Sequence, residues 1–177
     1  MKIDITQITD WKIASKTRPV KAKPLISLLV DRTVTSKFLV DTIEGREPLG
    51  DGVVICVGEA GDTWQQMPKK LLAKYKVVAI DADGWMVCEP LPDNAVNCIE
   101  MSVSIKFMEY CSPGGDEPDN KRGIFYINGQ WGETVPGLGS NIQWGNVGDF
   151  LCQNRTDPTD VWIVRRKLFL NTYVIKS

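Results

Sequence analysis

The sequence predicts a β-dominated α+β protein made of two tandem related units, each with short antiparallel strands and a short helical segment. The first observation is a pattern near residue 50 that returns without a gap near residue 148. The second is the alternation of β-branched and aromatic residues between glycine-containing turns, which is typical of antiparallel strands. The matching pairs are Gly50 and Gly148, Asp51 and Asp149, Trp64 and Trp162, Leu72 and Leu170, and Tyr75 and Tyr173.

Composition and charge indicate an ordered globular protein. Of its 177 residues, 43% are hydrophobic and 24% are charged, which excludes the low-hydrophobicity, high-charge composition of disordered chains. The formal net charge of −1 argues against a general binder of polyanions and against an acidic mimic of DNA. Acidic residues nevertheless concentrate between Glu89 and Asp119, which is consistent with a local electrostatic partner.

An N-terminal extension, residues 1–17, precedes the first unit. Its spaced isoleucines fit a short helix or an edge strand. The start of the chain has no apolar stretch as long as that of a signal peptide, and no window approaches the roughly 18 apolar residues of a membrane-spanning helix. We therefore expect a cytoplasmic protein that does not enter a membrane.

The first unit is expected over residues 18–88. Asp83-Gly84 between apolar runs indicates a tight hairpin turn, because both residues tolerate a positive φ. Pro68 suits the first position of a helix because it lacks a backbone N–H. The expected elements are a buried strand at 25–30, strands at 38–43 and 53–57, a return strand at 63–67, a helical segment at 69–74, and strands at 75–80 and 85–88.

A proline-containing linker at 89–93 leads into the second unit, which is expected over residues 94–177 with an acidic loop insertion at 111–122. Asn128-Gly129 is a second hairpin signal. The expected elements are a strand at 96–107, a strand at 124–127, a turn at Asn128-Gly129, a glycine-rich irregular stretch from Gly129 to Gly145, and a repeat of the first unit's elements at 147–176.

The order of these residues resembles that of the small PGDYG-motif proteins of bacteriophages. Lys23-Pro24 is followed by apolar residues, Gly50-Asp51 enters a β-branched strand, an aromatic return strand follows, and a leucine lies three residues before a tyrosine. The two copies read Leu49-Gly50-Asp51-Gly52 and Val147-Gly148-Asp149-Phe150, so both lack the motif's proline and its final tyrosine-glycine pair. The resemblance spans about residues 18–78 and 92–176. It implies a phage origin, a place in the host cytoplasm and an accessory role, and it transfers no catalytic activity.

The ionisable residues restrict the available chemistry. The chain has no histidine, which removes the usual general base near neutral pH, the histidine-containing nucleophile pairs and the histidine-containing zinc motifs. The cysteines are widely spaced among apolar neighbours, fit reduced core thiols and form no C-x-x-C pair, so no metal and no cofactor are expected. They are Cys56, Cys88, Cys98, Cys111 and Cys152.

The repeated glycine-aspartate pairs are interpreted as structural turns, in which glycine supplies backbone freedom and aspartate binds the amides of the turn. The competing hypothesis is a carboxylate pair of Asp51 and Asp149, which would make the protein an enzyme. Asp81 and Asp83 have a DxD spacing that a turn explains without a metal. Gly137-Leu138-Gly139-Ser140 lacks the following helix that a phosphate loop requires, so a plain loop is favoured.

Candidate binding residues fall into three groups. The aromatic residues of the repeat could stack on a base or anchor a small core. The basic residues of the repeat could contact phosphate or form a solvated helix surface, and the acidic loop is an exposed segment. The candidates are Trp64, Trp162, Tyr75 and Tyr173, then Arg165 and Arg166, and in the loop Asp116, Glu117 and Asp119.

The function that these observations favour is non-catalytic binding. We expect an accessory protein that engages a host macromolecule, with a host protein as partner and the acidic loop and glycine-rich stretch as contact surface, to inhibit a defence or transcription component. Nucleic acid remains open as a partner. The alternatives are a small-ligand module in which the units close around a nucleotide, an enzyme based on Asp51 and Asp149, and a structural part of the virion. The sequence sets neither the partner nor the oligomeric state.

Overall fold

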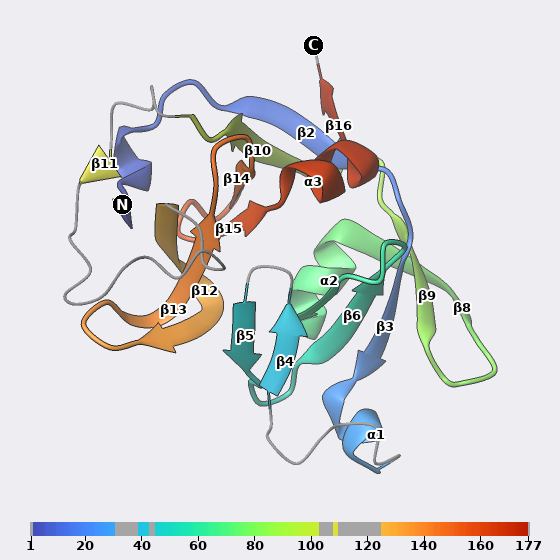
Figure 1. The fold of residues 1–177 in the computed structure, drawn as a ribbon. Coiled ribbons are helices and arrows are strands. Elements are labelled where there is room, and N and C mark those ends of the chain that lie inside the picture. Colours follow the sequence, from blue (N-terminus) through green and yellow to red (C-terminus); the bar gives the residue numbers. More distant parts are fainter. Residues whose placement is uncertain (1, 31–38, 43–44, 103–107, 110–124, 177) are drawn as a thin grey trace.

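The structure, a computed structural model, describes residues 2–30, 39–42, 45–102, 108–109 and 125–176. Strands dominate it and the helices are short, as expected for a β-dominated α+β protein. Among the described residues the strands form two five-stranded sheets, one four-stranded sheet and one two-stranded hairpin (Figure 1).

The first five-stranded sheet consists of residues expected in the first unit, together with Glu89 and Pro90 of the expected linker. Its strands are β3 (Val20–Pro24), β6 (Val54–Gly58), β7 (Thr63–Gln66), β8 (Tyr75–Ile80) and β9 (Met86–Pro90). They lie in the order β7-β6-β3-β9-β8, and each neighbouring pair is antiparallel. Helix α2 (Pro68–Lys74) carries the chain from edge strand β7 to edge strand β8.

The second five-stranded sheet has the same plan. Its strands are β2 (Lys12–Lys16), β10 (Ala95–Glu100), β14 (Phe150–Asn154), β15 (Val161–Val164) and β16 (Tyr173–Lys176). They lie in the order β15-β14-β10-β2-β16, again all antiparallel. Helix α3 (Arg166–Thr172) connects the edge strands β15 and β16, as α2 connects β7 and β8.

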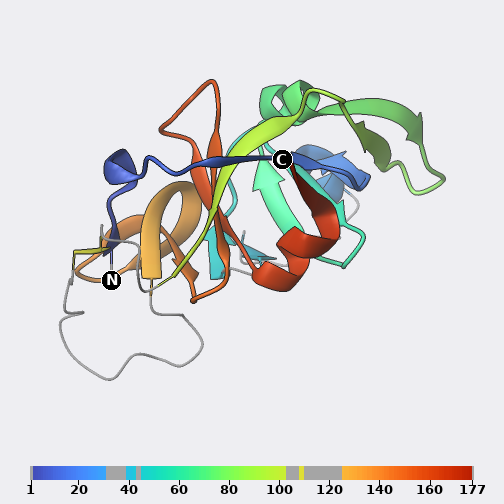
Figure 2. The ribbon, with the colours of Figure 1, turned by 90° about the horizontal axis from the view of Figure 1, so that it is seen from above.

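The chain passes between these two sheets twice, at equivalent places. β2 of the second sheet continues through residues 17–19 into β3 of the first, and β9 of the first continues through residues 91–94 into β10 of the second (Figure 2). β2 lies between β10 and β16, so residues 12–16 form an inner strand where the sequence indicated a helix or an edge strand. The N-terminal segment therefore completes a sheet whose other strands all come from residues 95–176.

Local patterns placed several elements correctly. The strands expected at 53–57, 63–67 and 75–80 correspond to β6, β7 and β8, and Pro68 is the first residue of α2. The turn at Asp83-Gly84 joins β8 to β9, and Gly84 has a φ of 79°. Strand β4 (Leu39–Thr42) forms a hairpin with β5 (Gly45–Pro48), which confirms the described part of the strand expected at 38–43.

The buried strand expected at 25–30 is wrong, because these residues form helix α1 (Leu25–Val30). Leu28 is buried against Val53 and Ile55, and Leu25 packs against the same cluster, whereas Ile26 is 68% exposed. Leu25 and Leu28 are three residues apart and share one face of a helix, but they would lie on opposite faces of a strand. The helix therefore packs Leu25 and Leu28 against this cluster and leaves Ile26 exposed.

The hairpin turn expected at Asn128-Gly129 is also wrong. Both residues lie inside β12 (Phe125–Val135), which runs antiparallel to β13 (Gly139–Gly145). Asn128 and Glu133 both pair with Ile142, so the residues between them form a bulge within the strand. The bulge places the turn-forming residues where the sheet bends, and the chain reverses only after Val135.

The stretch from Gly129 to Gly145 is consequently regular, which corrects its interpretation as an irregular exposed segment. It forms most of the β12–β13 hairpin, in which Ile142 and Trp144 are buried. The same sheet contains β1 (Lys2–Ile3) and β11 (Met108–Glu109), in the order β11-β1-β12-β13. The 3-10 helix η1 (Ile5–Gln7) follows β1.

The sequence alignment of the two copies shifts within the hairpins. Trp64 pairs with Cys56, whereas Trp162 pairs with Cys152, so the second hairpin is two residues longer. The alignment without a gap therefore holds from the tryptophans through the helices and closing strands, but it shifts by two residues in the strands β6 and β14. As a result Asp149 directly precedes β14, whereas two residues separate Asp51 from β6.

Each five-stranded sheet packs its helix through one fully buried residue. Leu71 of α2 lies in the core of the first sheet, and Phe169 of α3 lies in the core of the second, stacked at 3.8 Å on Phe150 and at 4.6 Å on Tyr173. Cys56, Cys88, Cys98 and Cys152 are buried thiols, while Cys111 lies outside the described residues. None of the helices in the described ranges is long and apolar enough to span a membrane.

Candidate functional site

A cavity of about 150 Å³ lies where α2, β7, β15 and α3 meet β12 and β13. The four aromatic side chains that the repeat singles out, Trp64, Trp162, Tyr75 and Tyr173, all line it. The sequence matched these residues in pairs, one pair on the hairpins and one at the ends of the helices. The structure brings both pairs to a single site.

Strand and helix lengths explain why these four residues converge. In each sheet the tryptophan lies on the outer strand of the hairpin, and a seven-residue helix then returns the chain so that the next residue begins the last strand. That residue is Tyr75 in the first sheet and Tyr173 in the second. The tyrosines are only 2% and 6% exposed, so they lie deep in the site.

Lys16 lies among three of these rings. It ends β2 and pairs with Tyr173 in the second sheet. Its Nζ is 4.6 Å from the ring centroid of Trp64, 5.3 Å from that of Tyr173 and 5.8 Å from that of Tyr75, within the range of cation–π attraction. Burial opposes its charge, but the hydroxyl oxygens of the tyrosines and the Asp62 carboxylate favour the ammonium form, so the pKa of Lys16 is raised. Lys16 is therefore charged at neutral pH.

Lys74, the last residue of α2, supplies a second cation. Its Nζ lies 4.2 Å from the ring centroid of Trp162. Burial is the largest influence and lowers the pKa of Lys74 to about 8; Asp160 acts in the opposite direction, while Lys16 and Lys70 lower it further. Within the part of the chain that the structure describes, neither Lys16 nor Lys74 has a carboxylate within ion-pair distance.

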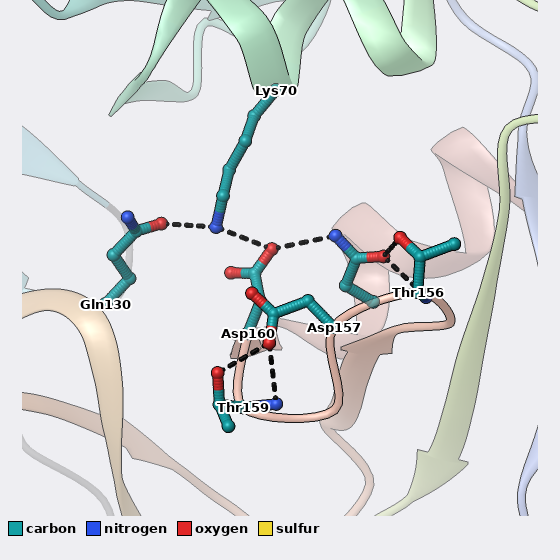
Figure 3. A network of polar contacts seen from close by, with 7 residues as sticks. Lys70, Gln130, Thr156, Asp157, Thr159 and Asp160 are labelled. Carbon is teal, nitrogen blue, oxygen red and sulfur yellow. Dashed lines mark hydrogen bonds and ion pairs between the residues drawn. The ribbon is translucent and has the colours of Figure 1, made fainter.

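Lys70 differs from these two lysines because its charge is compensated (Figure 3). Its Nζ lies 2.8 Å from Oδ2 of Asp160 and donates a hydrogen bond of 2.6 Å to Oε1 of Gln130. The same Asp160 oxygen accepts a hydrogen bond of 3.1 Å from Nδ2 of Asn154. This network ties α2 to β12 and to the β14–β15 hairpin at the boundary of the cavity.

Several polar atoms around the cavity are not satisfied. Among the described residues, the buried side-chain atoms without a close hydrogen-bond partner are Asp62 Oδ1, Tyr75 Oη, Trp131 Nε1 and Ser15 Oγ, and of these Tyr75 Oη interacts with the Lys16 ammonium. The first three belong to residues that line the cavity. A buried polar atom left without a partner costs about 1–3 kcal/mol, so such atoms call for an explanation. All four atoms are covered by neighbouring protein atoms and do not reach the open space of the cavity.

The tyrosine and cysteine side chains near the cavity stay neutral. Burial raises the pKa of Tyr75 and Tyr173 above that of an ordinary tyrosine. Burial also raises the pKa of Cys56 to about 12. Neither a tyrosinate nor a thiolate nucleophile is therefore populated here near neutral pH.

The glycine-aspartate pairs lie away from this cavity and have different environments. Asp149 is buried and accepts hydrogen bonds from the Arg165 guanidinium at 2.9 Å, the Arg166 amide at 2.9 Å and the Asn146 amide at 2.8 Å. Asp51 is exposed in the turn before β6. Neither aspartate lines the cavity, so the geometry offers no support for a catalytic pair of the two.

The two glycines of these pairs also serve different purposes. Gly148 has a φ of 89°, a conformation that other residues rarely adopt. Gly50 approaches Trp131 so closely that an added Cβ would lie 2.6 Å from the indole ring. Gly50 therefore helps to position a residue that lines the cavity, although it does not line the cavity itself.

The charged candidates are engaged elsewhere or lie beyond the described residues. Arg165 pairs with Asp149, and Arg166 pairs with Glu100. Asp81 of the DxD sequence accepts hydrogen bonds from the amides of its own turn and from Lys21. The acidic-loop candidates Asp116, Glu117 and Asp119, like the loop 111–122 as a whole, fall outside the described ranges.

The candidate site residues named from the sequence do not include the charged residues of the cavity. Asp62 and Asp160 occupy matching positions of the repeat, so the pattern contained a signal for them. Lys74 belongs to a basic cluster with Lys69, Lys70 and Lys76 in the sequence, but its counterpart in the second copy is Thr172, so the repeat does not mark it as a site residue. Lys16 lies outside the repeat, and only the pairing of β2 places it in the site.

Comparisons with known proteins give no further information: no family model matches the chain, and neither the curated proteins nor the solved structures contain a match. The resemblance to PGDYG-motif proteins stays a prediction.

Proposed function

We propose that the protein is a non-catalytic binding module for a small planar anion, with a nucleotide as the most fitting class. The observation that carries the proposal is the presence of two ammonium groups, each against an aromatic face and without an ion-paired carboxylate among the described residues, in one cavity. This function corresponds to the ligand-binding alternative considered from the sequence.

The charges of the cavity favour an anionic ligand. Its lining includes the lysines Lys16, Lys70 and Lys74 and the carboxylates Asp62 and Asp160. Asp160 compensates Lys70 at 2.8 Å, which leaves two ammonium groups against one carboxylate. A charge held away from water is costly unless it is paired, so a ligand with a phosphate or carboxylate group would stabilise the site.

The aromatic residues and the size of the cavity favour a planar ligand. A cavity of about 150 Å³ can hold one small aromatic ring, so the base is the part of a nucleotide that would enter it. Stacking of a base on an aromatic side chain contributes about 1–3 kcal/mol. Trp64 and Trp162 are half-buried and present such surfaces.

The matched strand orders of the two five-stranded sheets support a duplication of one ancestral unit, with the ligand bound where the copies meet. Corresponding positions of the repeat supply Trp64 and Trp162, Tyr75 and Tyr173, and Asp62 and Asp160. The lysines break this correspondence, since Lys16 and Lys74 do not match each other. The site is therefore not symmetric, and a ligand with one negatively charged end would bind in a single orientation.

The phage origin, the host cytoplasm and the engagement of a host macromolecule stay predictions. The acidic loop proposed as the contact surface lies outside the described residues, and the glycine-rich stretch contributes strands to a sheet. A nucleotide binder would also suit an accessory role, because sequestering a nucleotide deprives a host pathway of it. No separate observation favours a second function.

The test is isothermal titration calorimetry with the four ribonucleoside 5′-monophosphates and the corresponding nucleosides. We expect saturable binding of at least one monophosphate and weaker binding of its nucleoside, because the nucleoside lacks the phosphate that the lysines contact. Lys16→Met should weaken this binding by roughly tenfold to a hundredfold, the range for a charge-assisted hydrogen bond. Lys69→Met is the matched control, since Lys69 is exposed on α2 and does not line the cavity.

Two results would oppose the proposal. Equal affinity of nucleoside and monophosphate would argue against the anion requirement. Equal effects of Lys16→Met and Lys69→Met would show that binding occurs outside the cavity. If none of the nucleotides binds, the nucleotide class is wrong, and the same titration with benzoate and phenyl phosphate then tests whether the cavity accepts any planar anion.

A further inference from the structure

The position of Lys74 affects the reactivity of its amine as well as its charge. Its amine lies in the cavity at the C-terminal end of α2, with Nζ 4.2 Å from the ring centroid of Trp162. None of the carboxylates in the described ranges lies within 4.0 Å of it, because the nearby Asp160 is held by Lys70. Lys74 is thus a desolvated amine that faces a ligand space, whereas surface lysines are hydrated.

The groups around Lys74 favour its neutral form. Burial lowers its pKa to about 8, Lys16 and Lys70 act in the same direction, and Asp160 and Cys152 oppose them. At pH 7 the neutral amine is therefore roughly 300-fold more abundant than in an ordinary lysine. Desolvation and a neighbouring cation are the two devices by which proteins convert lysine into a nucleophile.

We propose that Lys74 forms an imine with a small anionic carbonyl compound that binds in the cavity. The inference rests on the proposed binding of planar anions at this site. Lys16, which lines the same cavity with its Nζ 4.6 Å from the ring centroid of Trp64, would hold the anionic group, and the aromatic faces would hold the planar part. The chemical class is an aromatic aldehyde or an α-keto acid that carries a phosphate or carboxylate.

The reaction needs no group that the chain and the ligand lack. The lone pair of the neutral Lys74 nitrogen attacks the carbonyl carbon, and the carbonyl oxygen takes up a proton as the nitrogen loses one, which gives a carbinolamine. Loss of water then forms the carbon–nitrogen double bond. One amine and one carbonyl yield one imine and one water, with no change in oxidation state, and hydrolysis reverses the step.

The probe is pyridoxal 5′-phosphate, which combines a planar ring, a phosphate and an aldehyde. The protein is incubated with limiting probe at pH 7.5, the imine is reduced with cyanoborohydride, and the labelled lysine is identified by peptide mass spectrometry. We expect Lys74 to be labelled at least tenfold faster than the exposed Lys69, and excess pyridoxine 5′-phosphate, which lacks the aldehyde, to suppress the Lys74 label.

Two variants and one binding measurement separate the possible failures. Lys74→Met should lose the label, whereas Lys69→Met should retain it. Labelling of Lys74 no faster than of Lys69 would overturn the imine proposal. If pyridoxine 5′-phosphate still binds the cavity by calorimetry in that case, the anion-binding function stands alone. If it does not bind and Lys74 is unlabelled, both this inference and binding of planar phosphates at the site are wrong.

Discussion

A residue of the cavity can lower the stability of the folded protein although it would favour ligand binding. Lys74 is the clearest case, because burial disfavours its ammonium form and no carboxylate among the described residues forms an ion pair with it. Its aliphatic stem and the Trp162 ring would pack equally well if the charge were absent. A protein that keeps such a group at a ligand cavity exchanges stability for function.

Replacing Lys74 with methionine should therefore stabilise the unliganded protein. The folded-state pKa of about 8 lies below the unfolded value of 10.5, so the destabilisation is complete below pH 8 and fades as the pH rises toward 10.5. At pH 7 we expect Lys74→Met to raise the free energy of unfolding by about 1–2 kcal/mol, which is roughly 2–8 °C in Tm by calorimetry. The difference from the unsubstituted protein should shrink above pH 10. A lower Tm for Lys74→Met at pH 7 would contradict this account.

The same lysine should make ligand binding depend on pH. A nucleoside monophosphate is already a dianion above pH 7, because its second pKa is about 6. Lys74 loses its proton as the pH rises through about 8, so the affinity should fall by roughly two- to tenfold between pH 7 and pH 9. Calorimetry across this range should show the decrease in the unsubstituted protein and a flat profile in Lys74→Met. Parallel profiles would assign the dependence to another group.

At the scale of elements, the start of α3 depends on Asp149. The helix has no side-chain cap of its own, and the Asp149 carboxylate accepts hydrogen bonds from the Arg166 amide at 2.9 Å and from the Arg165 guanidinium at 2.9 Å. The same carboxylate accepts from the Asn146 amide at 2.8 Å. One side chain thereby joins the turn before β14 to the first turn of the helix.

Asp149→Ala should consequently cost about 2–4 kcal/mol, because it leaves two amides and a guanidinium without their partner. The matched control is Asp51→Ala, which removes the exposed aspartate of the other copy and should stay within about 0.5 kcal/mol. Urea unfolding at pH 7 measures both. Equal destabilisation by the two substitutions would indicate that the two turns have equivalent roles.

Sequence reasoning at this scale succeeded where local chemistry decides the structure. Pro68 and the Asp83-Gly84 turn act through their own backbone preferences, and both were placed correctly. Sequence reasoning failed where contacts with other parts of the chain decide the structure. Asn128-Gly129 has a strong turn preference, but Ile142 of the opposite strand accommodates the extra residues as a bulge. Leu25 and Leu28 lie in a helix, in which both pack against the cluster of Val53 and Ile55.

At the scale of the whole molecule, the site could be predicted only in part. The repeat identified the four aromatic residues because each copy carries them at the same position relative to a hairpin and a helix. Nothing local identifies Lys16. It reaches the cavity because Ala14 pairs with Val96 on one side and with Ile175 on the other, contacts that join distant parts of the chain. Such pairings follow from the global arrangement of strands.

Removing residues 1–17 provides the strongest test of this arrangement. The second sheet would lose the strand between β10 and β16, the buried Ala14 would leave its core, and Lys16 would be absent from the cavity. We expect a marked loss of strand signal in far-UV circular dichroism, a thermal transition that is no longer cooperative, and no ligand binding. A free N-terminal extension would instead leave both the spectrum and the Tm unchanged.

Adding the missing strand as a separate peptide makes the test specific. A synthetic peptide of residues 1–19 should restore the strand signal and ligand binding to the truncated chain, because the backbone ladders to β10 and β16 need no covalent link to β3. The matched peptide with Ala14→Asp should fail, since it would bring a charge into a fully buried position. A peptide with Lys16→Met that restores the fold but not ligand binding would make a further distinction. It would show that the structural role of β2 is separate from the role of Lys16 in the site.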